Sequence, residues 1–485
     1  MRGQERSQSE EPEDQYRRFR IATGWPGAGV LIALAAAATV VVLYGPDTSL
    51  SLVDGPVPPI TFALALMGLI VGLAGRTLRW WVTWGLGIAV TAALLVWLLW
   101  WWLGAAEIVT QPYPRSFIIV VWIAFFAVGV ALTGWWSGPA VLRVARFAAA
   151  PIVCCAAFLF INGQYGYWPT MGALLGRPVA GQVSGKALSG ILSIRHPTSI
   201  NDSELIEHVG VFGPVSIPSP RHFDAGGAWA WVPPMFDRVD HADLPVLVML
   251  PGIPGSPYDW ERAGLVTSVA DAWARAHGGI APVMVLVSEN GAYDRDTECV
   301  NGPNGDAEDY LTRSVPEFLK HRFGISVDPE RWAVVGFSEG GTCAIGLAAE
   351  HPSIFGRFVD IAGDAGPNIG PNNASTLVDL YGRKTSEILH HEPLWLLVHH
   401  RYPSTEGWFA SSSGDPIHER VARELDKAAH LAGMKVFNDG GGPGGHSWTY
   451  ATSVFRSIYP ALVASMPAFP IRLEPLDRVA KRVSI

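Results

Sequence analysis

Apolar residues are distributed unevenly along this chain of 485 residues. From about Gly24 to Ile161 the sequence is almost continuously apolar, and its few charges lie in short clusters. After about Asn162, short apolar runs alternate with charged, helix-forming stretches. A chain of this length usually holds more than one domain. The pattern therefore predicts two parts of different kinds, one suited to lipid and one suited to water.

Five apolar segments in the first part are candidates for membrane-spanning helices, which need about 20 mostly apolar residues. The segments are residues 27–45, 58–75, 80–104, 116–136 and 143–161. The last reaches spanning length only if Arg143 and Arg146 extend toward the interface. Tryptophans cluster at segment ends, as indole rings at the headgroup level do. Because several long uncharged runs follow one another, buried core helices are the weaker interpretation. The segments hold no internal Asp, Glu, Lys or His, so we interpret the bundle as an anchor rather than a channel or transporter.

The arginines predict an orientation. They cluster before the first segment, between the second and third, and between the fourth and fifth, whereas the other two connections hold only Arg115. Basic loops stay cytoplasmic. With five spans, the N-terminus is cytoplasmic and the part after residue 162 is extracytoplasmic. If the fifth segment does not cross, that part would be cytoplasmic instead.

These patterns suggest a division of the chain, with a lipid bilayer as one expected partner. We expect a disordered cytoplasmic tail (1–23), membrane helices (24–162), a linker (163–207), a second domain (208–470) and a C-terminal tail (471–485). The net charge of −8 and the lack of a basic stripe argue against a nucleic-acid partner. The oligomeric state stays open.

Strand-like and helix-like runs alternate in the second domain. The strand-like runs are residues 228–234, 244–252, 281–289, 331–337, 357–363, 407–415 and 434–440. Helical patterns cover 259–277, 306–323 and 416–433. Several strand-like runs are apolar throughout, as strands buried on both faces of a parallel sheet are. The alternation predicts a mostly parallel, doubly wound sheet with helices on its faces, and an active site outside the carboxyl ends of its strands.

One glycine-rich turn has the pattern of a catalytic serine. Gly336-Phe337-Ser338-Glu339-Gly340 is G-x-S-x-G, lying between a predicted strand and a predicted helix. Glycines two residues before and after the serine remove the clashes of such a strained turn. We therefore expect Ser338 to be a nucleophile, with an ordinary glycine-rich loop as the alternative.

A serine nucleophile needs a base, which should come last in the chain, after an acid. His446 follows the last predicted strand in a glycine-rich loop, and the other histidines are worse placed. Asp415 leaves the preceding strand, although it could simply cap the next helix. Asp360 and Asp364 are the reserve candidates for the acid.

Backbone N–H groups near the serine should form an oxyanion hole. One donor is expected from Glu339. The other is expected from the loop after the 244–252 run, where Ile253 is preferred over Gly252. An ordinary strand–helix turn is the alternative for this loop.

The four cysteines fall into two pairs. Cys154 and Cys155 lie in the fifth apolar segment. Cys299 and Cys343 could form one disulfide in an oxidising compartment, or remain two buried thiols. No Cys/His spacing suggests a metal site, and we predict no cofactor.

The second domain resembles the putative esterase family of α/β-hydrolases, which includes enterochelin esterase-like proteins, S-formylglutathione hydrolase and the mycolyltransferases. The resemblance covers roughly 208–460 and is carried by LVMLPGIPGSPYDW, DTECVNG, WAVVGFSEGGTCAIGLAAEHPSIFGRFVDIAG and GGHSW. It implies a triad of Ser338, Asp415 and His446, and the layout with membrane helices is similar to membrane-bound actinobacterial esterase-like proteins. Unlike the secreted mycolyltransferases, this chain has a helix bundle, and no residue dictates a trehalose site.

Three functions follow as hypotheses. The first is a membrane-anchored extracytoplasmic serine esterase that cleaves lipid or cell-envelope esters through an acyl-serine. The second is an acyltransferase, mycolyltransferase-like, that passes the acyl group to a sugar or glycerol hydroxyl. The third is a catalytically inactive envelope scaffold.

Overall fold

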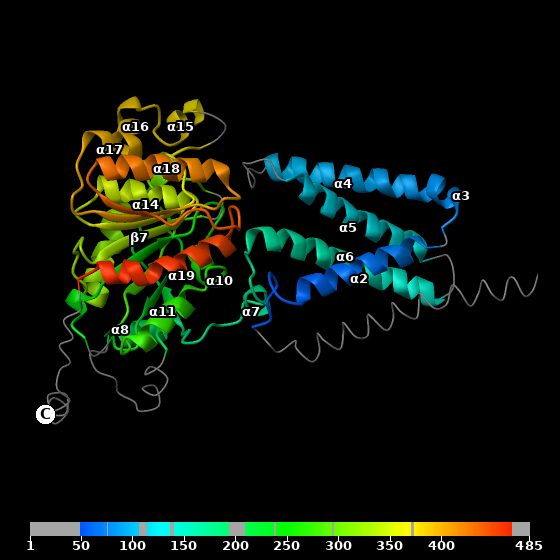
Figure 1. Ribbon diagram of the computed structural model, residues 1–485, viewed down its shortest axis with the longest axis horizontal. Helices are drawn as coiled ribbons and strands as arrows, with labels where there is room; N and C mark the ends of the chain where they lie inside the picture. Colours follow the sequence, from blue (N-terminus) through cyan, green and yellow to red (C-terminus); the bar gives the residue numbers. More distant parts are fainter. Residues whose placement is uncertain are drawn as a thin grey trace, which may run out of the picture. The chain divides into compact units, whose positions relative to one another are not determined.

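The computed structural model describes residues 49–74, 76–105, 114–135, 140–193, 209–236, 239–292, 295–369 and 373–467. These residues form two compact units (Figure 1). The helical unit comprises the described residues up to 164 together with 168–175. The α/β unit comprises residues 165–167 and the described residues from 176 onward.

The helical unit consists mainly of long apolar helices. Its elements are α2 (Val57–Leu73), α3 (Leu78–Trp80), the π-helical turn η1 (Trp81–Gly85), α4 (Leu86–Ala105), α5 (Arg115–Gly134), α6 (Ala140–Tyr165) and α7 (Met171–Leu174). Three helices, Leu78–Gly104, Arg115–Gly134 and Leu142–Tyr165, are long and apolar enough to cross a membrane, while α2 has only 17 residues. The expected count of five is therefore corrected to three within the described residues. The predicted segment 27–45 lies outside them.

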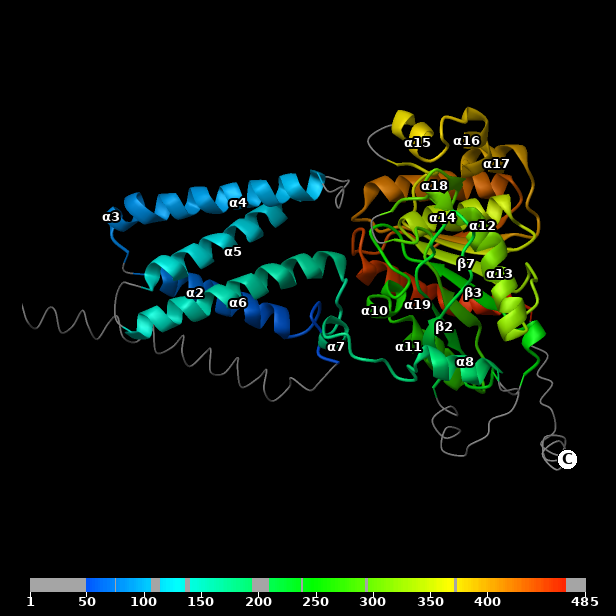
Figure 2. The same cartoon turned by 180° about the vertical axis from the view of Figure 1, so that it is seen from behind.

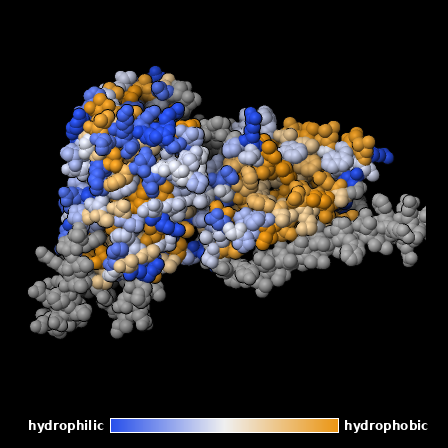
Figure 3. All heavy atoms as spheres, viewed as in Figure 1, coloured by the Kyte–Doolittle hydropathy of each residue, from blue (hydrophilic) through white to orange (hydrophobic). Residues whose placement is uncertain are grey.

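Small residues allow these helices to approach closely. A Cβ atom at Gly68 of α2 would lie 2.8 Å from the Cβ of Ala149 of α6, and one at Gly129 of α5 would lie 2.4 Å from the side chain of Ile88 of α4. Glycines at such contacts are typical of helices that pack in lipid. Large apolar side chains such as Trp97 remain on the outside, where Figure 3 shows extensive apolar surface.

The α/β unit is built on one eight-stranded sheet. Its strands are β1 (Val211–Val215), β2 (Ala228–Val232), β3 (Val246–Leu250), β4 (Val283–Leu286), β7 (Trp332–Phe337), β8 (Arg357–Ile361), β9 (Glu406–Ala410) and β10 (Lys435–Asn438), in the order β1-β2-β4-β3-β7-β8-β9-β10. From β4 to β10 all neighbours are parallel, and β2 is antiparallel to both β1 and β4. A separate two-stranded hairpin joins β5 (Asn301–Gly302) to β6 (Gly305–Asp306). The mostly parallel sheet confirms the α/β part of the predicted fold class.

Helices cover both faces of the sheet (Figures 1 and 2). They are α8 (Gly185–Ser193), η3 (His241–Asp243), α10 (Asp259–Arg262), α11 (Val266–Ala276), α12 (Ala307–Asp309), η4 (Tyr310–Ser314), α13 (Val315–Phe318), η5 (Leu319–Phe323), α14 (Glu339–Glu350), α15 (Asn373–Asp379), α16 (Thr385–His391), α17 (Pro393–His399), α18 (Pro416–Leu431) and α19 (Trp448–Ser465). One core packs α14, α18 and the α12–η5 helix on one face, and a second core packs α11 and α19 on the other.

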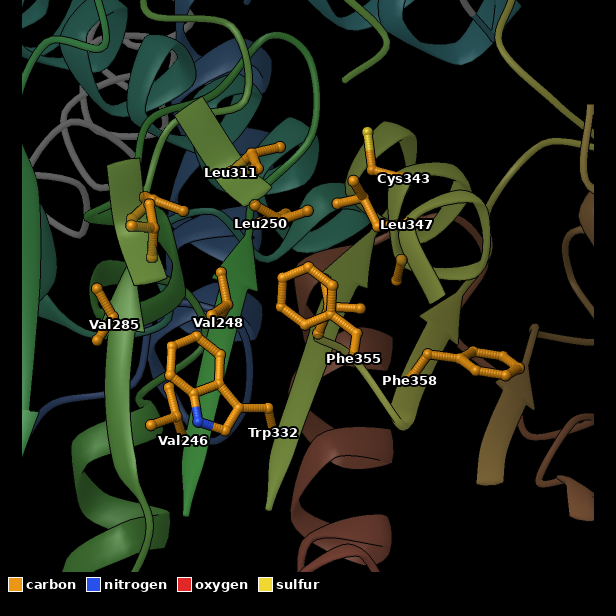
Figure 4. Packing of buried hydrophobic residues seen from close by; sticks show 14 of the residues in the cluster. Val246, Val248, Leu250, Val285, Leu311, Trp332, Cys343, Leu347, Phe355 and Phe358 are labelled. Atoms are coloured by element: carbon orange, nitrogen blue, oxygen red, sulfur yellow. The ribbon is translucent and has the colours of Figure 1, made fainter. Parts of the chain in front are cut away.

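Alternating side chains of the buried strands feed the two cores. In β3, Val248 belongs to the first core and Leu247 to the second, and neither is exposed. Figure 4 shows Val248 and Leu250 in the first cluster, together with Leu311 of η4 and Leu347 of α14. Burial on both faces explains why these strands are continuous apolar runs in the sequence.

Each of the seven predicted strand-like runs overlaps one strand of the sheet. Strand β1 was not predicted, because Gly213 and Pro214 interrupt its apolar pattern. Proline is tolerated there since β1 is the edge strand of the sheet in the described part of the chain, paired with β2 and, at Phe212, bridged to Gln182. The predicted helix 259–277 is divided into α10 and α11 at Leu265, whose φ of 51° is left-handed.

Candidate active site

Ser338 occupies a strained turn between β7 and α14. Its φ of 60° and ψ of −126° lie outside the regions that non-glycine residues favour. A Cβ atom at Gly336 would lie 1.7 Å from the carbonyl oxygen of Gly340, and one at Gly340 would lie 2.3 Å from that of Leu250. Both glycines are therefore required by close backbone contacts, as the G-x-S-x-G pattern suggested.

His446 and Asp415 lie next to this serine in the order that the sequence predicted. The Nε2 atom of His446 is 2.8 Å from the Oγ of Ser338, and its Nδ1 is 2.8 Å from the Oδ2 of Asp415. In the tautomer that fits both contacts, Nδ1 donates to the carboxylate and Nε2 accepts from the hydroxyl. These residues follow strands β7, β9 and β10, so they meet at the carboxyl edge of the sheet.

Asp415 also caps a helix, so both interpretations of its position hold. It is the N-cap residue of α18, and its carboxylate accepts a hydrogen bond from the backbone N–H of His418. The same carboxylate contacts the His418 ring, whose Nδ1 is 2.8 Å from both oxygens. The other ring nitrogen, Nε2, is 3.4 Å from Oδ1 of Asp364. Asp415 therefore contacts two imidazoles.

Hydrogen bonds and nearby charges shift the pKa values of Asp415, His418 and Asp364. Burial alone would raise the pKa of Asp415, but hydrogen bonds and charge from His418 and His446 hold it well below its usual range. Burial would lower the pKa of His418, but its bonds to Asp364 and Asp415 raise it to about 9. Burial alone would raise the pKa of Asp364, but the contact with His418 lowers it below its ordinary value.

The two reserve acids do not contact His446 directly. Asp360 is buried behind the turn and accepts the N–H of Gly363 at 2.8 Å, and burial raises its pKa to about 7. Asp364 bonds to His418 instead. The structure thus brings together the predicted Ser338, Asp415 and His446. His418 was missed, although its spacing of three residues after Asp415 at a helix start puts the two side chains on one turn.

Gly252 and Glu339 lie against the serine, but the N–H of Gly252 is already engaged. A Cβ at Gly252 would lie 3.2 Å from the Cβ of Ser338 and 3.5 Å from the backbone nitrogen of Glu339. The N–H of Gly252 donates to Oε1 of Glu289 at 2.6 Å. Among the described residues, the N–H groups of Ile253 and Glu339 have no hydrogen-bond acceptor. The geometry thus favours Ile253 and Glu339 over Gly252.

Buried carboxyl groups lie directly behind these donors. The side chain of Glu339 accepts a hydrogen bond from Asn290 at 2.7 Å. Burial, reinforced by neighbouring acids, raises the pKa of Glu289 to about 8 and that of Glu339 above its usual range. Burial therefore favours the protonated form of both groups, which reduces the negative charge beside the serine.

A disulfide joins Cys299, in the loop after β4, to Cys343 of α14. It ties that loop to the helix that begins directly after Ser338. Cys154 and Cys155 of α6 are free and exposed. Of the two arrangements that the sequence left open, the structure contains the disulfide.

Two groups of side chains in the described residues have the atom types and spacing to hold a metal ion. They are Asp415 with His418 and His446, and Glu308 with Glu350 and His351. In the first group, hydrogen bonds within the site already engage the ring nitrogens. In the second, His351 bonds to Glu308 at 2.8 Å, and Glu350 bonds to His391 at 2.9 Å. Neither group has an atom that a metal is needed to explain.

Comparisons with known proteins point to one family. The model of the family described as putative esterase matches residues 231–460. An uncharacterized protein of Corynebacterium glutamicum is 29% identical over 415 residues, which cover 82% of this chain and 94% of that protein. The MPT51 antigen of Mycobacterium leprae is 28% identical over 143 residues, 28% of this chain and 46% of the antigen. A ferulic acid esterase structure is 15% identical, covering 53% of this chain and 99% of that one, with a TM-score of 0.45.

The family match spans the part of the sheet from β2 onward and every residue of the site described above. Its first matched residue lies in β2, and its last lies within α19. Residues 231–460 of this chain thus match the putative esterase family. Together with the esterase relatives, this match supports an enzyme that cleaves esters or transfers their acyl groups.

Proposed function

We propose that this protein is a membrane-anchored, extracytoplasmic serine esterase that acts on lipid or cell-envelope esters through an acyl-serine intermediate. The observation that carries the proposal is the continuous chain of contacts from Ser338 through His446 to Asp415, each of 2.8 Å. Such a chain activates a hydroxyl that is otherwise a weak nucleophile.

The reaction begins with the serine hydroxyl. Oγ of Ser338 attacks the carbonyl carbon of the ester, and its proton passes to Nε2 of His446. Asp415 holds the ring in the tautomer that accepts this proton and stabilises the imidazolium that results. The carbonyl oxygen becomes an oxyanion, to which the N–H groups of Ile253 and Glu339 donate.

The tetrahedral intermediate then collapses. Its bond to the alcohol oxygen breaks, His446 returns the proton to the leaving alcohol, and the acyl group stays on Ser338. In the second half, water attacks the acyl-serine and gives a proton to His446. The bond between the acyl group and Oγ then breaks, His446 returns the proton to Ser338, and the free acid is released. An alcohol acceptor in place of water would give a new ester by the same steps, which is the acyltransferase alternative.

Three features support a membrane-anchored, extracytoplasmic site. In the described part of the helical unit, three helices are long and apolar enough to cross a membrane. The arginines before the first apolar segment and between alternate segments favour a cytoplasmic N-terminus. The Cys299–Cys343 disulfide supports an oxidising compartment for the α/β unit, since disulfides are rare in the cytosol. Anchoring raises the effective concentration of substrates in the same membrane, which favours lipid or envelope esters.

Active-site labelling tests the chemistry. The full-length protein in detergent is treated with a fluorophosphonate probe, and the labelled peptide is identified by mass spectrometry. We expect one label on Ser338, no label in Ser338→Ala, and normal labelling in Ser268→Ala, which removes an exposed hydroxyl of α11. Labelling that persists in Ser338→Ala would refute the proposed nucleophile. Total lack of labelling would favour the scaffold hypothesis.

Product analysis separates hydrolysis from transfer. The intact mass of the protein after exposure to envelope lipids should show an acyl group on Ser338. Free acid as the product in the presence of glycerol or trehalose supports an esterase. Acylated glycerol or trehalose would instead support the acyltransferase.

A fusion experiment tests the location. A reporter that is active only outside the membrane is fused after Ile485, and a second fusion carries a reporter active only in the cytoplasm. Activity of the first alone is expected. Activity of the second alone would reverse the proposed orientation.

A further inference from the structure

His418 is a second imidazole in contact with Asp415. It lies in the first turn of α18, and 8% of its side chain is exposed. The Oδ2 atom of Asp415 is 2.8 Å from the Nδ1 atoms of both His418 and His446. The two rings lie 4.5 Å apart between centroids. The mechanism described above assigns no role to His418.

The contacts of His418 favour an imidazole ring that is protonated on both nitrogens. Each of its nitrogens faces a carboxylate, Asp415 at Nδ1 and Asp364 at Nε2. A neutral imidazole has one nitrogen without a proton, and its lone pair would face a carboxylate oxygen. The imidazolium donates to both carboxylates, so the geometry favours the cation.

This cation sets the total charge beside His446. Asp415 and Asp364 carry two negative charges, and protonated His418 leaves a net charge of about −1, equal to that of one carboxylate. Asp360 also interacts with His418, and burial raises the pKa of Asp360 to about 7, so it is mostly neutral at lower pH. His446 thus faces the charge of a single acid although two are present.

We propose that His418 is a positioning residue, which orients Asp415 and offsets the second acid, Asp364, so that His446 stays neutral and able to accept the serine proton. This inference rests on the proposed function of Ser338. It predicts that removing His418 and removing the charge of Asp364 have opposite effects on how readily His446 takes up a proton.

The pH dependence has a definite sign. The rise in the pKa of His418 to about 9 keeps its charge throughout the neutral range. As the pH rises through 9 that charge is lost, together with the bond to one carboxylate. Below that range, the charge balance determines where His446 becomes protonated and the serine loses its base. We call the pH range over which the labelling rate falls on the acidic side the acid limb of the activity profile.

The test uses four full-length variants in detergent, with the second-order rate of fluorophosphonate labelling measured from pH 5 to 10. In His418→Gln, two uncompensated carboxylates should move the acid limb to higher pH by about one unit and slow labelling at pH 7 by about tenfold. In Asp364→Asn, the limb should move to lower pH, by less than one unit, since 41% of the Asp364 side chain is exposed. The double variant restores the net charge, and its acid limb should return close to the wild-type position. His430→Gln, which removes an exposed histidine from the same helix, should match the wild type.

The opposite signs distinguish this role from a purely structural one. A loss of packing or of helix capping would lower the rate at every pH without moving the acid limb, and that result in His418→Gln would overturn the inference. Shifts of the same sign in both single variants would also overturn it. Should His418→Gln fail to fold, an unmoved limb in Asp364→Asn is sufficient to reject the inference. Wild-type protein that is not labelled on Ser338 refutes the proposed function instead.

Discussion

The helical unit and the α/β unit place apolar side chains in opposite environments. Trp97 of α4 is 61% exposed, whereas Trp332 of β7 is completely buried (Figure 4). The difference extends to polar groups, because every buried carboxylate among the described residues lies in the α/β unit. An apolar outer surface suits lipid, and buried charge needs a core to hold its partners. Similar apolar runs thus form outward-facing apolar helices in one region and the buried strands of a sheet in the other.

The largest expected effect is the loss of chemistry without a loss of fold. His446→Ala should reduce labelling and ester hydrolysis by about 10⁴-fold or more, because the serine loses its base. The side chain is 34% exposed, so the protein should remain folded and stay in the membrane fraction. Labelling rates and circular dichroism check both statements. His399→Ala, at an exposed position at the end of α17, is the control. Comparable activity in both variants would show that the base lies elsewhere.

Matched tryptophan truncations test the burial contrast itself. Trp332→Ala leaves a cavity in the core and removes a hydrogen bond to the Ser326 carbonyl, so it should cost about 3–5 kcal/mol. Trp97→Ala removes a mostly exposed ring. In detergent it should change the free energy of local opening of α4 by less than ~1 kcal/mol. Hydrogen exchange of amides in β7 and α4 measures each value within the full-length chain. Equal costs would contradict the contrast between the units.

The two pairs of cysteines give a smaller contrast. Cys343→Ser removes a disulfide that spans 44 residues and should destabilise the α/β unit by about 2–4 kcal/mol. Cys154→Ser removes a free, exposed thiol from α6 and should have little effect. Thermal unfolding, followed by loss of fluorophosphonate labelling, compares the two. If Cys343→Ser melts like the wild type, the disulfide does not stabilise the unit.

Much of the fold could be predicted because the strands of a parallel sheet are recognisable from sequence alone. Runs such as those around Val248 and Val334 are apolar throughout, since both faces of the strand are buried. Strand β1 escaped prediction because an edge strand tolerates Pro214 and Gly213, which a pattern search takes as a turn. The break at Leu265 is also hidden, because a left-handed leucine depends on its surroundings rather than on its own preference.

The residues of the site were likewise only partly predictable from the sequence. Ser338, Asp415 and His446 could be named because each follows a strand in a required order along the chain. His418 was not named, although its spacing from Asp415 was a local signal, because its second partner, Asp364, comes from a different loop. The engagement of the Gly252 N–H by Glu289 depends on a contact across 37 residues. Partners at such separations become visible only in the folded chain.

The last prediction concerns a buried acid that takes no part in the contacts of the serine site. Glu261 of α10 is 1% exposed and accepts hydrogen bonds from the N–H and hydroxyl of Thr267, at 2.9 Å and 3.0 Å. Burial nevertheless raises its pKa to about 7, from 4.5 in an exposed glutamate. Between these two values the unfolded chain has released this proton and the folded chain retains it. Stability contributed by this group therefore falls as the pH rises from 4.5 to 7.

Glu261→Gln removes this dependence while keeping the shape and one acceptor of the side chain. Because the amide does not ionise, the stability of the variant relative to the wild type should increase across pH 4.5 to 7, by up to about 3 kcal/mol. Hydrogen exchange of β3 amides at several pH values gives this difference directly. Glu424→Gln, at an exposed position of α18, should give a difference that does not change with pH. If the stability difference for Glu261→Gln is also constant with pH, the folded α/β unit holds Glu261 ionised. Burial in this unit would then not shift the protonation of its acids.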